Sequence, residues 1–140
     1  MAIVHLCRVL HILLLHTSPH HLYAGDVNAA FLLLHWGANV ETTDLNGDTP
    51  LLWLIRNKST VPGTTAHELI KLLLRFGAST LASNPTDGNN TLHVLVTLPK
   101  IDLKTSFLLY QAAGPTGKLA VNKNNLTPYQ VRAACAVLYV

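Results

Sequence analysis

Charged residues, cysteines and long apolar runs are all scarce in this chain, and each scarcity excludes a class of protein. Charged residues fill only 12% of the 140 positions, and 10 basic residues against 7 acids leave a formal charge of +3. The basic residues form no run, so we expect no nucleic-acid partner. Two cysteines near opposite ends, Cys7 and Cys135, are too few for a disulfide framework or a four-thiolate zinc site. With 49% hydrophobic residues, the composition predicts one folded domain in a reduced, cytosolic setting.

No stretch is long and apolar enough to span a membrane. The longest apolar run is Ala133–Val140, whereas a spanning helix needs about 18 apolar residues or more, so no direct membrane insertion is predicted. Positions 1–23 form an apolar N-terminal segment, in which Arg8 precedes the apolar stretch Val9–Leu15 and the small residues Ala24 and Gly25 follow. This segment has two interpretations: a signal peptide with a small-residue cleavage site, or a degenerate repeat. Interrupting histidines make secretion the less favoured one.

A motif that ends in Gly-Ala recurs at an interval of about 40 residues. Leu33–Ala38, with the sequence Leu-Leu-His-Trp-Gly-Ala, returns as Leu-Leu-Arg-Phe-Gly-Ala at Leu73–Ala78. A weaker copy at Leu108–Ala113 has alanine, Ala112, in place of the glycine. Such self-similarity indicates stacked repeats rather than one irregular domain.

A turn signature follows the same period. Asp44–Leu51 reads Asp-Leu-Asn-Gly-Asp-Thr-Pro-Leu, and related segments occur at Asn84–His93 and Asn122–Tyr129. Glycine after Asp or Asn favours a positive φ angle in a turn, and Asn125 is the next most tolerant residue in that position. Each unit therefore begins with a tight turn.

The residues after the turn predict a pair of helices. Thr49 is expected to cap a short helix that begins at Pro50, where the missing N–H has no cost. In a second helix, apolar residues between Ala66 and Leu74 recur at positions i, i+3, i+4, i+7 and i+8, which is the pattern of one buried face. Gly77 is expected to end this helix as a C-cap glycine.

These residues resemble the ankyrin repeat family. Its core motif, Gly-x-Thr-Pro-Leu-His followed by a helical pair closing in Leu-Leu-x-x-Gly-Ala, is matched at Gly47–Leu52 and by both Gly-Ala closures. The chain departs from the motif at Leu52, where the family has histidine, and at Asn90-Thr91, which stand for Thr-Pro. The resemblance implies an all-α helix-turn-helix solenoid of about three to four units within residues 24–140. The expected units are 24–45, 46–85, 86–121 and a truncated 122–140.

A narrower resemblance concerns the later ankyrin repeats of the Asp-His-His-Cys palmitoyltransferases related to the huntingtin-interacting protein. The order of Asn46–Trp53, a lengthened loop, Leu72–Phe76 and Asn89–His93 is similar to those repeats. Nothing catalytic carries over, because leucine, Leu22, stands where that activity requires a cysteine after His-His. The ankyrin-bearing cation channels, suggested by Asn90–Val96, are a further alternative.

The chemistry-bearing residues form no predicted metal or catalytic site. His16, His20 and His21 include an i, i+4 pair, but Pro19 opposes a helix there and no carboxylate follows until Asp26. Nucleophile elbows, phosphate loops and dinucleotide turns are absent from the sequence.

Two features of the C-terminal third of the sequence, Gly114–Lys118 and Cys135, are not predicted to form a reactive site. Gly114–Lys118 is superficially like a phosphate loop, but its glycine spacing is wrong and it follows a helical segment. Cys135 lies among small apolar residues, so we expect a buried thiol of low reactivity. No enzymatic activity and no cofactor are predicted for this chain.

Binding is therefore the expected role, through turn tips and short first helices, which can vary without disturbing a stacked core. The predicted partner-contacting residues share these positions: Glu41, Thr43, Leu45, Asp48, Trp53, Arg56, Asn84, Asp87 and Asn89, with Thr42 and Thr86 beside them. Trp53 is interpreted equally as contact or core. Residues 58–65 form either a binding loop or a tolerated insertion.

The residues that the motif assigns to structure are Gly37, Gly47, Thr49, Pro50, Gly77, Gly88, His93, Thr127 and Pro128. Among them, the resemblance implies that His93 bonds turn backbone between neighbouring repeats.

The sequence thus predicts a non-catalytic module that binds another protein or peptide. Three hypotheses remain open: a free-standing adaptor, the substrate-recruiting segment of a membrane palmitoyltransferase on the cytosolic face, and a secreted or effector protein. Apolar residues at both ends, where a repeat array normally carries polar caps, predict a fragment or a chain that requires a partner.

Overall fold

The chain is built of helices and turns. The computed structural model describes residues 23–57, 61, 63–99 and 102–138, and within these ranges it contains six helices and no strand. The helices are α2 (Tyr23–His35), α3 (Pro50–Arg56), α4 (Gly63–Arg75), α5 (Thr91–Thr97), α6 (Leu103–Leu119) and α7 (Pro128–Leu138). The all-α prediction is confirmed. Positions 1–22 lie outside the described residues, and they include Cys7, the three clustered histidines and most of the segment interpreted as a signal peptide or a degenerate repeat. Most of the loop at 58–62 also lies outside them.

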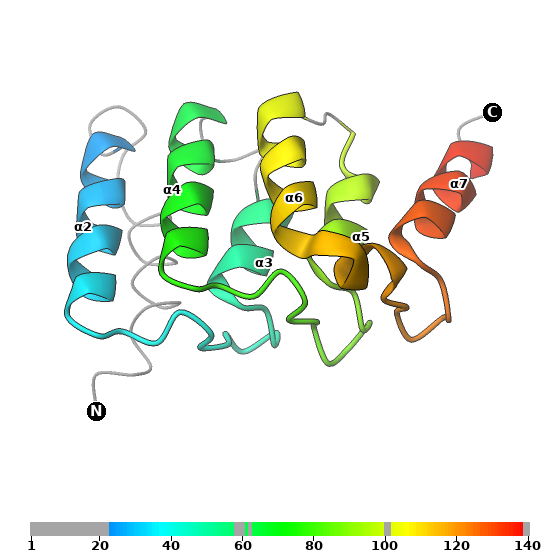
Figure 1. Cartoon of the computed structure of the whole chain (residues 1–140), viewed down its shortest axis with the longest axis horizontal. Helices are drawn as coiled ribbons and strands as arrows, with labels where there is room; N and C mark the ends of the chain where they lie inside the picture. The colour runs from blue at the N-terminus through cyan, green and yellow to red at the C-terminus, as the bar shows by residue number, and fades with distance from the viewer. Residues whose placement is uncertain (1–22, 58–60, 62, 100–101, 139–140) are drawn as a thin grey trace.

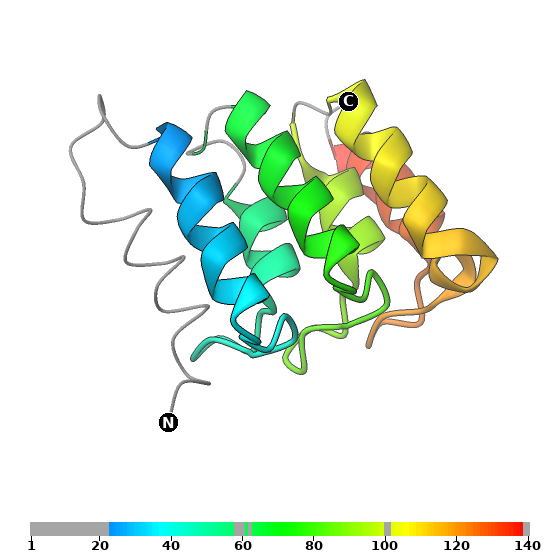
Figure 2. The same ribbon diagram turned by 60° about the vertical axis from the view of Figure 1, so that its left-hand side comes forward.

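The helices form two layers that run side by side. Helices α2, α4 and α6 make the layer nearest the viewer in Figure 1, and α3, α5 and α7 lie behind it. Figure 2 shows the same two rows after rotation. Contacts join α2 to α4 and α4 to α6 in one row, and α3 to α5 and α5 to α7 in the other. Because each helix packs against its counterpart one pair further on, the apolar faces are covered by stacking.

The core is continuous between the two layers. Leu52, Leu54 and Ile55 of α3 are completely buried, and Leu69 and Ile70 of α4 are at most 1% exposed. The predicted apolar face of the second helix is therefore confirmed. A buried leucine contributes roughly 1.5–3 kcal/mol relative to an exposed one, so this shared core is what holds short helices of seven residues in place.

Three turns of one design lie at the same end of the helix pairs. Their first residues, Asp44, Asn84 and Asn122, each accept a hydrogen bond from the N–H two positions on, at 2.9, 2.7 and 3.0 Å. A residue with positive φ follows in each turn, as the sequence predicts: Gly47 at 81°, Gly88 at 71° and Asn125 at 57°. A cap then starts the next helix. The turns therefore begin at positions 44, 84 and 122.

Helix α6 breaks at the first glycine after the weak third copy of the closure. The helix continues through Ala113 and breaks at Gly114, with φ 58° and ψ −166°, in agreement with the helical segment expected before Gly114–Lys118. Pro115 then opens a final turn. The break falls at Gly114 because alanine resists positive φ whereas glycine does not.

Cys135 is more exposed than the sequence predicts. The thiol was predicted to be buried, but the residue is only half-buried in α7 and is a free cysteine. Helix α7 packs on α5 and α6 with one side, and no described element covers its other side. Burial of an apolar segment depends on a neighbour, which the local sequence does not reveal.

Candidate functional site

Successive turns lie against one another and are joined by asparagine side chains. Nδ2 of Asn84 donates to the carbonyl of Asn46 at 2.9 Å and to Oδ1 of Asp48 at 2.7 Å. One turn further on, Nδ2 of Asn122 donates to Oδ1 of Asn89 at 2.9 Å. The same device therefore couples each turn to the one before it, and it fixes the spacing of the turn tips.

Close approach of the turns requires two of the glycines. A Cβ on Gly47 would lie 2.7 Å from Cδ of Pro85, and a Cβ on Gly88 would lie 2.8 Å from the backbone nitrogen of Lys123. Both glycines also have positive φ. At these two positions glycine serves the contact between turns as well as the conformation of its own turn.

Arg56, at the end of α3, bridges two successive turns. Its Nε lies 3.1 Å from Oδ1 and 3.0 Å from Oδ2 of Asp48, and its Nη2 lies 2.9 Å from Oδ2 of Asp87. The Asp48 side chain is 7% exposed, whereas those of Arg56 and Asp87 are 32% and 35% exposed. The pair with Asp48 is thus shielded from water, and the pair with Asp87 lies at the surface.

The electrostatics of this bridge favour the charged forms. Burial opposes the guanidinium charge, but the hydrogen bond to Asp87 and the charges of both aspartates outweigh it and raise the pKa of Arg56 above its ordinary value. Burial likewise opposes ionisation of Asp87, yet hydrogen bonds from Asn89 and Arg56 prevail and hold the pKa of Asp87 below its ordinary 3.8. Arg56 and Asp87 are therefore both charged at neutral pH.

An open cleft of about 440 Å³, here called the tip cleft, lies around this bridge. Its lining comes from two turns and the end of α3: Leu45, Asn46, Asp48, Arg56, Asn84, Thr86 and Asp87. Six of these seven residues belong to the predicted contact set, and sequence reasoning missed only Asn46. Its carbonyl accepts from Asn84, a bond that no local pattern indicates.

The other predicted contact residues lie outside the cleft lining. Oε1 of Glu41 accepts the N–H of Ser79 at 2.6 Å, which joins two successive units. Thr43 is exposed and Thr42 is half-buried. Trp53 is half-buried and packs against the core, and Asn89 is engaged by Asn122.

The residues assigned to structure lie at turns and caps. Gly37 and Gly77 follow α2 and α4 with φ of 86° and 87°. Thr49 caps α3 and accepts the N–H of Leu52 at 3.4 Å, with Pro50 buried at the first helical position. Thr127 accepts the N–H of Gln130 at 3.4 Å in the turn before α7, which begins at Pro128.

His93 joins two neighbouring helix pairs. It is 1% exposed, and its Nε2 lies 2.8 Å from the carbonyl oxygen of Leu126, 33 positions further on. Since a carbonyl only accepts, Nε2 carries the proton. Asn90 caps α5 beside it, accepting the N–H groups of Leu92 and His93 and donating its own N–H to Nδ1 of His93. Asn90-Thr91 thus occupy the positions that Thr49-Pro50 occupy one unit earlier.

No family model matches the chain, and no curated protein is significantly similar to it. Within the described ranges, no group of three or more His, Cys, Asp or Glu side chains is placed to hold a metal ion. Among the helices described above, none has the length and apolar character needed to cross a membrane.

Proposed function

We propose that this chain is a non-catalytic protein-interaction module of the ankyrin-repeat type, which holds a segment of another protein in the tip cleft. The observation that carries the proposal is the convergence of predicted contact residues from two successive turns and α3 on one open cleft. Separate stretches of sequence, about 40 residues apart, are thereby brought to a single surface.

The repeat assignment is supported by equivalence at three places. Turns starting at Asp44, Asn84 and Asn122 share the same side-chain hydrogen bond, the same residue of positive φ and the same cap before a helix. Each turn is followed by a short helix, and the two complete units add a longer helix after it. A unit of this kind buries its apolar faces only against its neighbours, which is the physical definition of a repeat array.

The cleft has the features needed for recognition of an exposed peptide segment. Leu45 is fully exposed at the rim and supplies an apolar contact, while Asn46 and Thr86 are exposed polar residues beside it. The Arg56 bridge holds both turns in position before a partner arrives. A preorganised surface loses less conformational freedom on binding, and this preserves affinity.

The charged groups of the cleft suit binding rather than catalysis. Asp48 and Asp87 are both paired with the same guanidinium, and the depressed pKa of Asp87 keeps it an anion at neutral pH. A general acid or base works best with a pKa near the operating pH. No described residue distinguishes a palmitoyltransferase parent from a free-standing adaptor, so we propose the interaction role alone.

The proposal is tested by selecting ligands from a displayed library of unstructured peptides against the full 140-residue chain. Leu45→Asp combined with Thr86→Arg changes the rim of the cleft at two exposed side chains, so the fold is expected to persist. We expect the affinity of the selected ligands to fall about tenfold or more.

The matched control makes the same chemical changes away from the cleft, as Leu103→Asp with Thr64→Arg, at two exposed positions that begin α6 and α4. Ligands that lose equal affinity to both pairs of changes, or to neither, would contradict a binding role for the tip cleft. Circular dichroism of each variant verifies that the helices are retained.

A further inference from the structure

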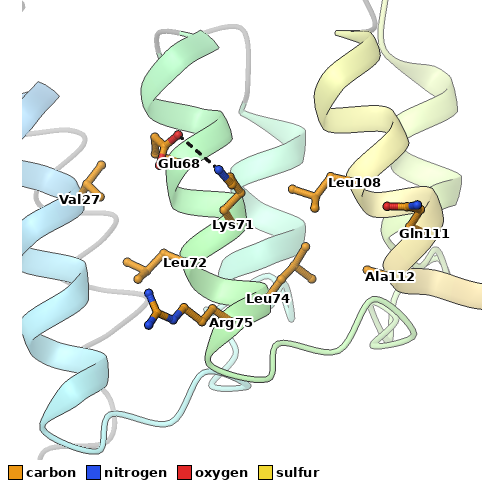
Figure 3. Close-up of a pocket in the computed structure, with 9 residues that line it drawn as sticks. All are labelled: Val27, Glu68, Lys71, Leu72, Leu74, Arg75, Leu108, Gln111 and Ala112. Carbon is orange, nitrogen blue, oxygen red and sulfur yellow. Dashed lines mark ion pairs between the residues drawn. The ribbon is translucent and has the colours of Figure 1, made fainter.

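The layer of long helices carries a second recess, distinct from the tip cleft. An open groove of about 740 Å³ extends across α4 to α2 on one side and to α6 on the other. In Figure 3, Leu72 and Arg75 point from α4 toward α2, while Leu74 points toward α6. The groove is here called the α4 groove, and none of its lining residues belongs to the predicted contact set.

The floor of the α4 groove is apolar. Val27 from α2, Leu72 and Leu74 from α4, and Leu108 and Ala112 from α6 contribute to its lining. Leu72 is 9% exposed, Val27, Leu74 and Leu108 are half-buried, and Ala112 is exposed at the edge of the floor. A recess of this kind accepts an inserted apolar side chain better than it accepts a flat surface.

The rim of the α4 groove is cationic. Lys71 and Arg75 are both exposed and lie one helical turn apart, about 6 Å along the axis of α4. Glu68 is the only acid in the lining, and its Oε1 lies 3.9 Å from Nζ of Lys71, an exposed pair of little strength. In the described part of the chain, no hydrogen bond or ion pair engages the guanidinium of Arg75. At least one cation is thus available to a ligand.

The two recesses differ in the sign of their charge. The turns carry four of the seven acids of the chain: Glu41, Asp44, Asp48 and Asp87. The layer formed by α2, α4 and α6 instead carries the exposed cations Lys71 and Arg75 on α4. A further exposed cation, Lys104, lies on α6 one turn before Leu108. An acidic segment is therefore attracted to the α4 groove and repelled by the turns, which discriminates between the two surfaces.

We propose that the α4 groove binds an acidic amphipathic helix of a partner protein. Two carboxylates one turn apart on the partner helix face Lys71 and Arg75, because positions i and i+4 repeat at the same interval on both helices. Leucine-type side chains on the same face of the partner enter the apolar floor between α4 and α6. This surface is separate from the tip cleft, so a partner bound at one leaves the other accessible.

The test uses the full chain and a displayed library of helical peptides with randomised surface positions. We expect selected peptides to be enriched in glutamate or aspartate pairs spaced by four residues, together with leucine. Lys71→Glu combined with Arg75→Glu is expected to weaken their binding about fivefold or more. Both side chains are exposed, so circular dichroism is expected to show that the helices are retained, with only a small fall in melting temperature from the new carboxylates near Glu68 and the end of α4.

The matched control reverses two exposed cations outside the groove, Lys123→Glu with Arg132→Glu, and so makes the same change in net charge. Equal loss of affinity in both double variants would overturn the site in favour of general charge attraction. Absence of acidic enrichment would also overturn it. A third outcome would also overturn the site: no peptide is selected, but the chain sediments with phosphatidylserine vesicles in a salt-dependent manner that requires Lys71 and Arg75. The ligand would then be a membrane surface. Failure of the tip cleft is separately detected by Leu45→Asp with Thr86→Arg, which is expected to leave binding at the α4 groove unchanged.

Discussion

Nη2 of Arg56 and Oδ2 of Asp87 lie 2.9 Å apart although the residues are 31 positions apart in the sequence. This ion pair ties the end of α3 to the turn that precedes α5, and Nε of the same guanidinium holds Asp48 in the turn before. A contact between two units therefore shapes the tip cleft. The contribution of the Arg56–Asp87 ion pair to stability can be measured from the pH dependence of unfolding.

Asp87→Asn is expected to lower the free energy of unfolding at pH 7 by about 0.2–1 kcal/mol, because the ion pair is partly exposed. The pKa of Asp87 lies below its ordinary 3.8 in the folded chain, so its stabilising contribution is complete above that value and disappears as the pH falls through the lower folded pKa. The difference between wild type and variant, measured by urea denaturation, should thus shrink as the pH falls below 3.8. Asparagine retains an acceptor for the N–H of Asn89, so the turn is preserved. A difference that does not shrink as the pH falls below 3.8 would show that the charge of Asp87 contributes nothing.

Gly88→Ala is expected to destabilise the chain more than Gly77→Ala. Both glycines have positive φ, which costs an alanine about 1–2 kcal/mol. Only at Gly88 does the added Cβ meet backbone, 2.8 Å from the nitrogen of Lys123, whereas Gly77 has open space. Overpacking adds about 1–3 kcal/mol at Gly88. Chemical denaturation of the two variants provides the comparison, and equal losses would mean that the turns do not lie as close as 2.8 Å implies.

Thr91→Val is expected to stabilise the chain, whereas Thr105→Val destabilises it. Both threonines are 0% exposed. Oγ1 of Thr91 has no hydrogen-bond partner among the described residues, so removing this hydroxyl recovers a desolvation cost of about 1 kcal/mol or more. The hydroxyl of Thr105 instead donates to Asp102 at 2.5 Å and lies 3.1 Å from Nδ1 of His67, so its loss costs about 1–3 kcal/mol. Melting temperatures that shift in the same direction for both variants would refute this distinction.

His93→Leu is expected to destabilise the chain by about 1–3 kcal/mol and to loosen α7 in particular. The substitution removes the 2.8 Å bond to the carbonyl of Leu126 and the acceptor for the N–H of Asn90. Hydrogen exchange should therefore quicken in α7 more than in α3, because the bond from His93 reaches Leu126 in the turn that precedes α7. His35→Leu, at an exposed position on α2, serves as the control. Uniform acceleration of exchange throughout the chain would argue against a local link at His93.

Local structure was largely predictable because its causes are local. Thr49 and Pro50 start α3, and Gly47 takes the positive φ that its turn requires. Asn90-Thr91, which stand where the family has Thr-Pro, keep the cap, because the Asn90 side chain accepts the N–H groups of Leu92 and His93. The helical segment expected before Gly114–Lys118 is also present, and α6 breaks at Gly114, where glycine adopts a positive φ.

The candidate sites were predictable only in part. The period placed Leu45 and Asp87 at successive turn tips, and the structure brings both to one cleft. The α4 groove was not anticipated, although Lys71 and Arg75 lie at positions i and i+4, because this spacing is common on solvent-facing helix surfaces. Its apolar floor depends on Val27 and Leu108, which come from helices on either side of α4.

The sequence by itself therefore determined the helices, their caps and the tight turns. Their causes, hydrogen bonds over two to four residues and apolar residues at helical spacing, act within one unit. Only the tertiary structure decided which charges meet and which recesses open. Arg56 finds Asp87, and Lys71 lies near Leu108, through stacking of units about 40 residues apart, and stacking depends on the shapes of both partners at once. The role of a side chain at such an interface depends on the side chain that it contacts in the neighbouring unit. The sequence pattern of one unit does not identify that contact.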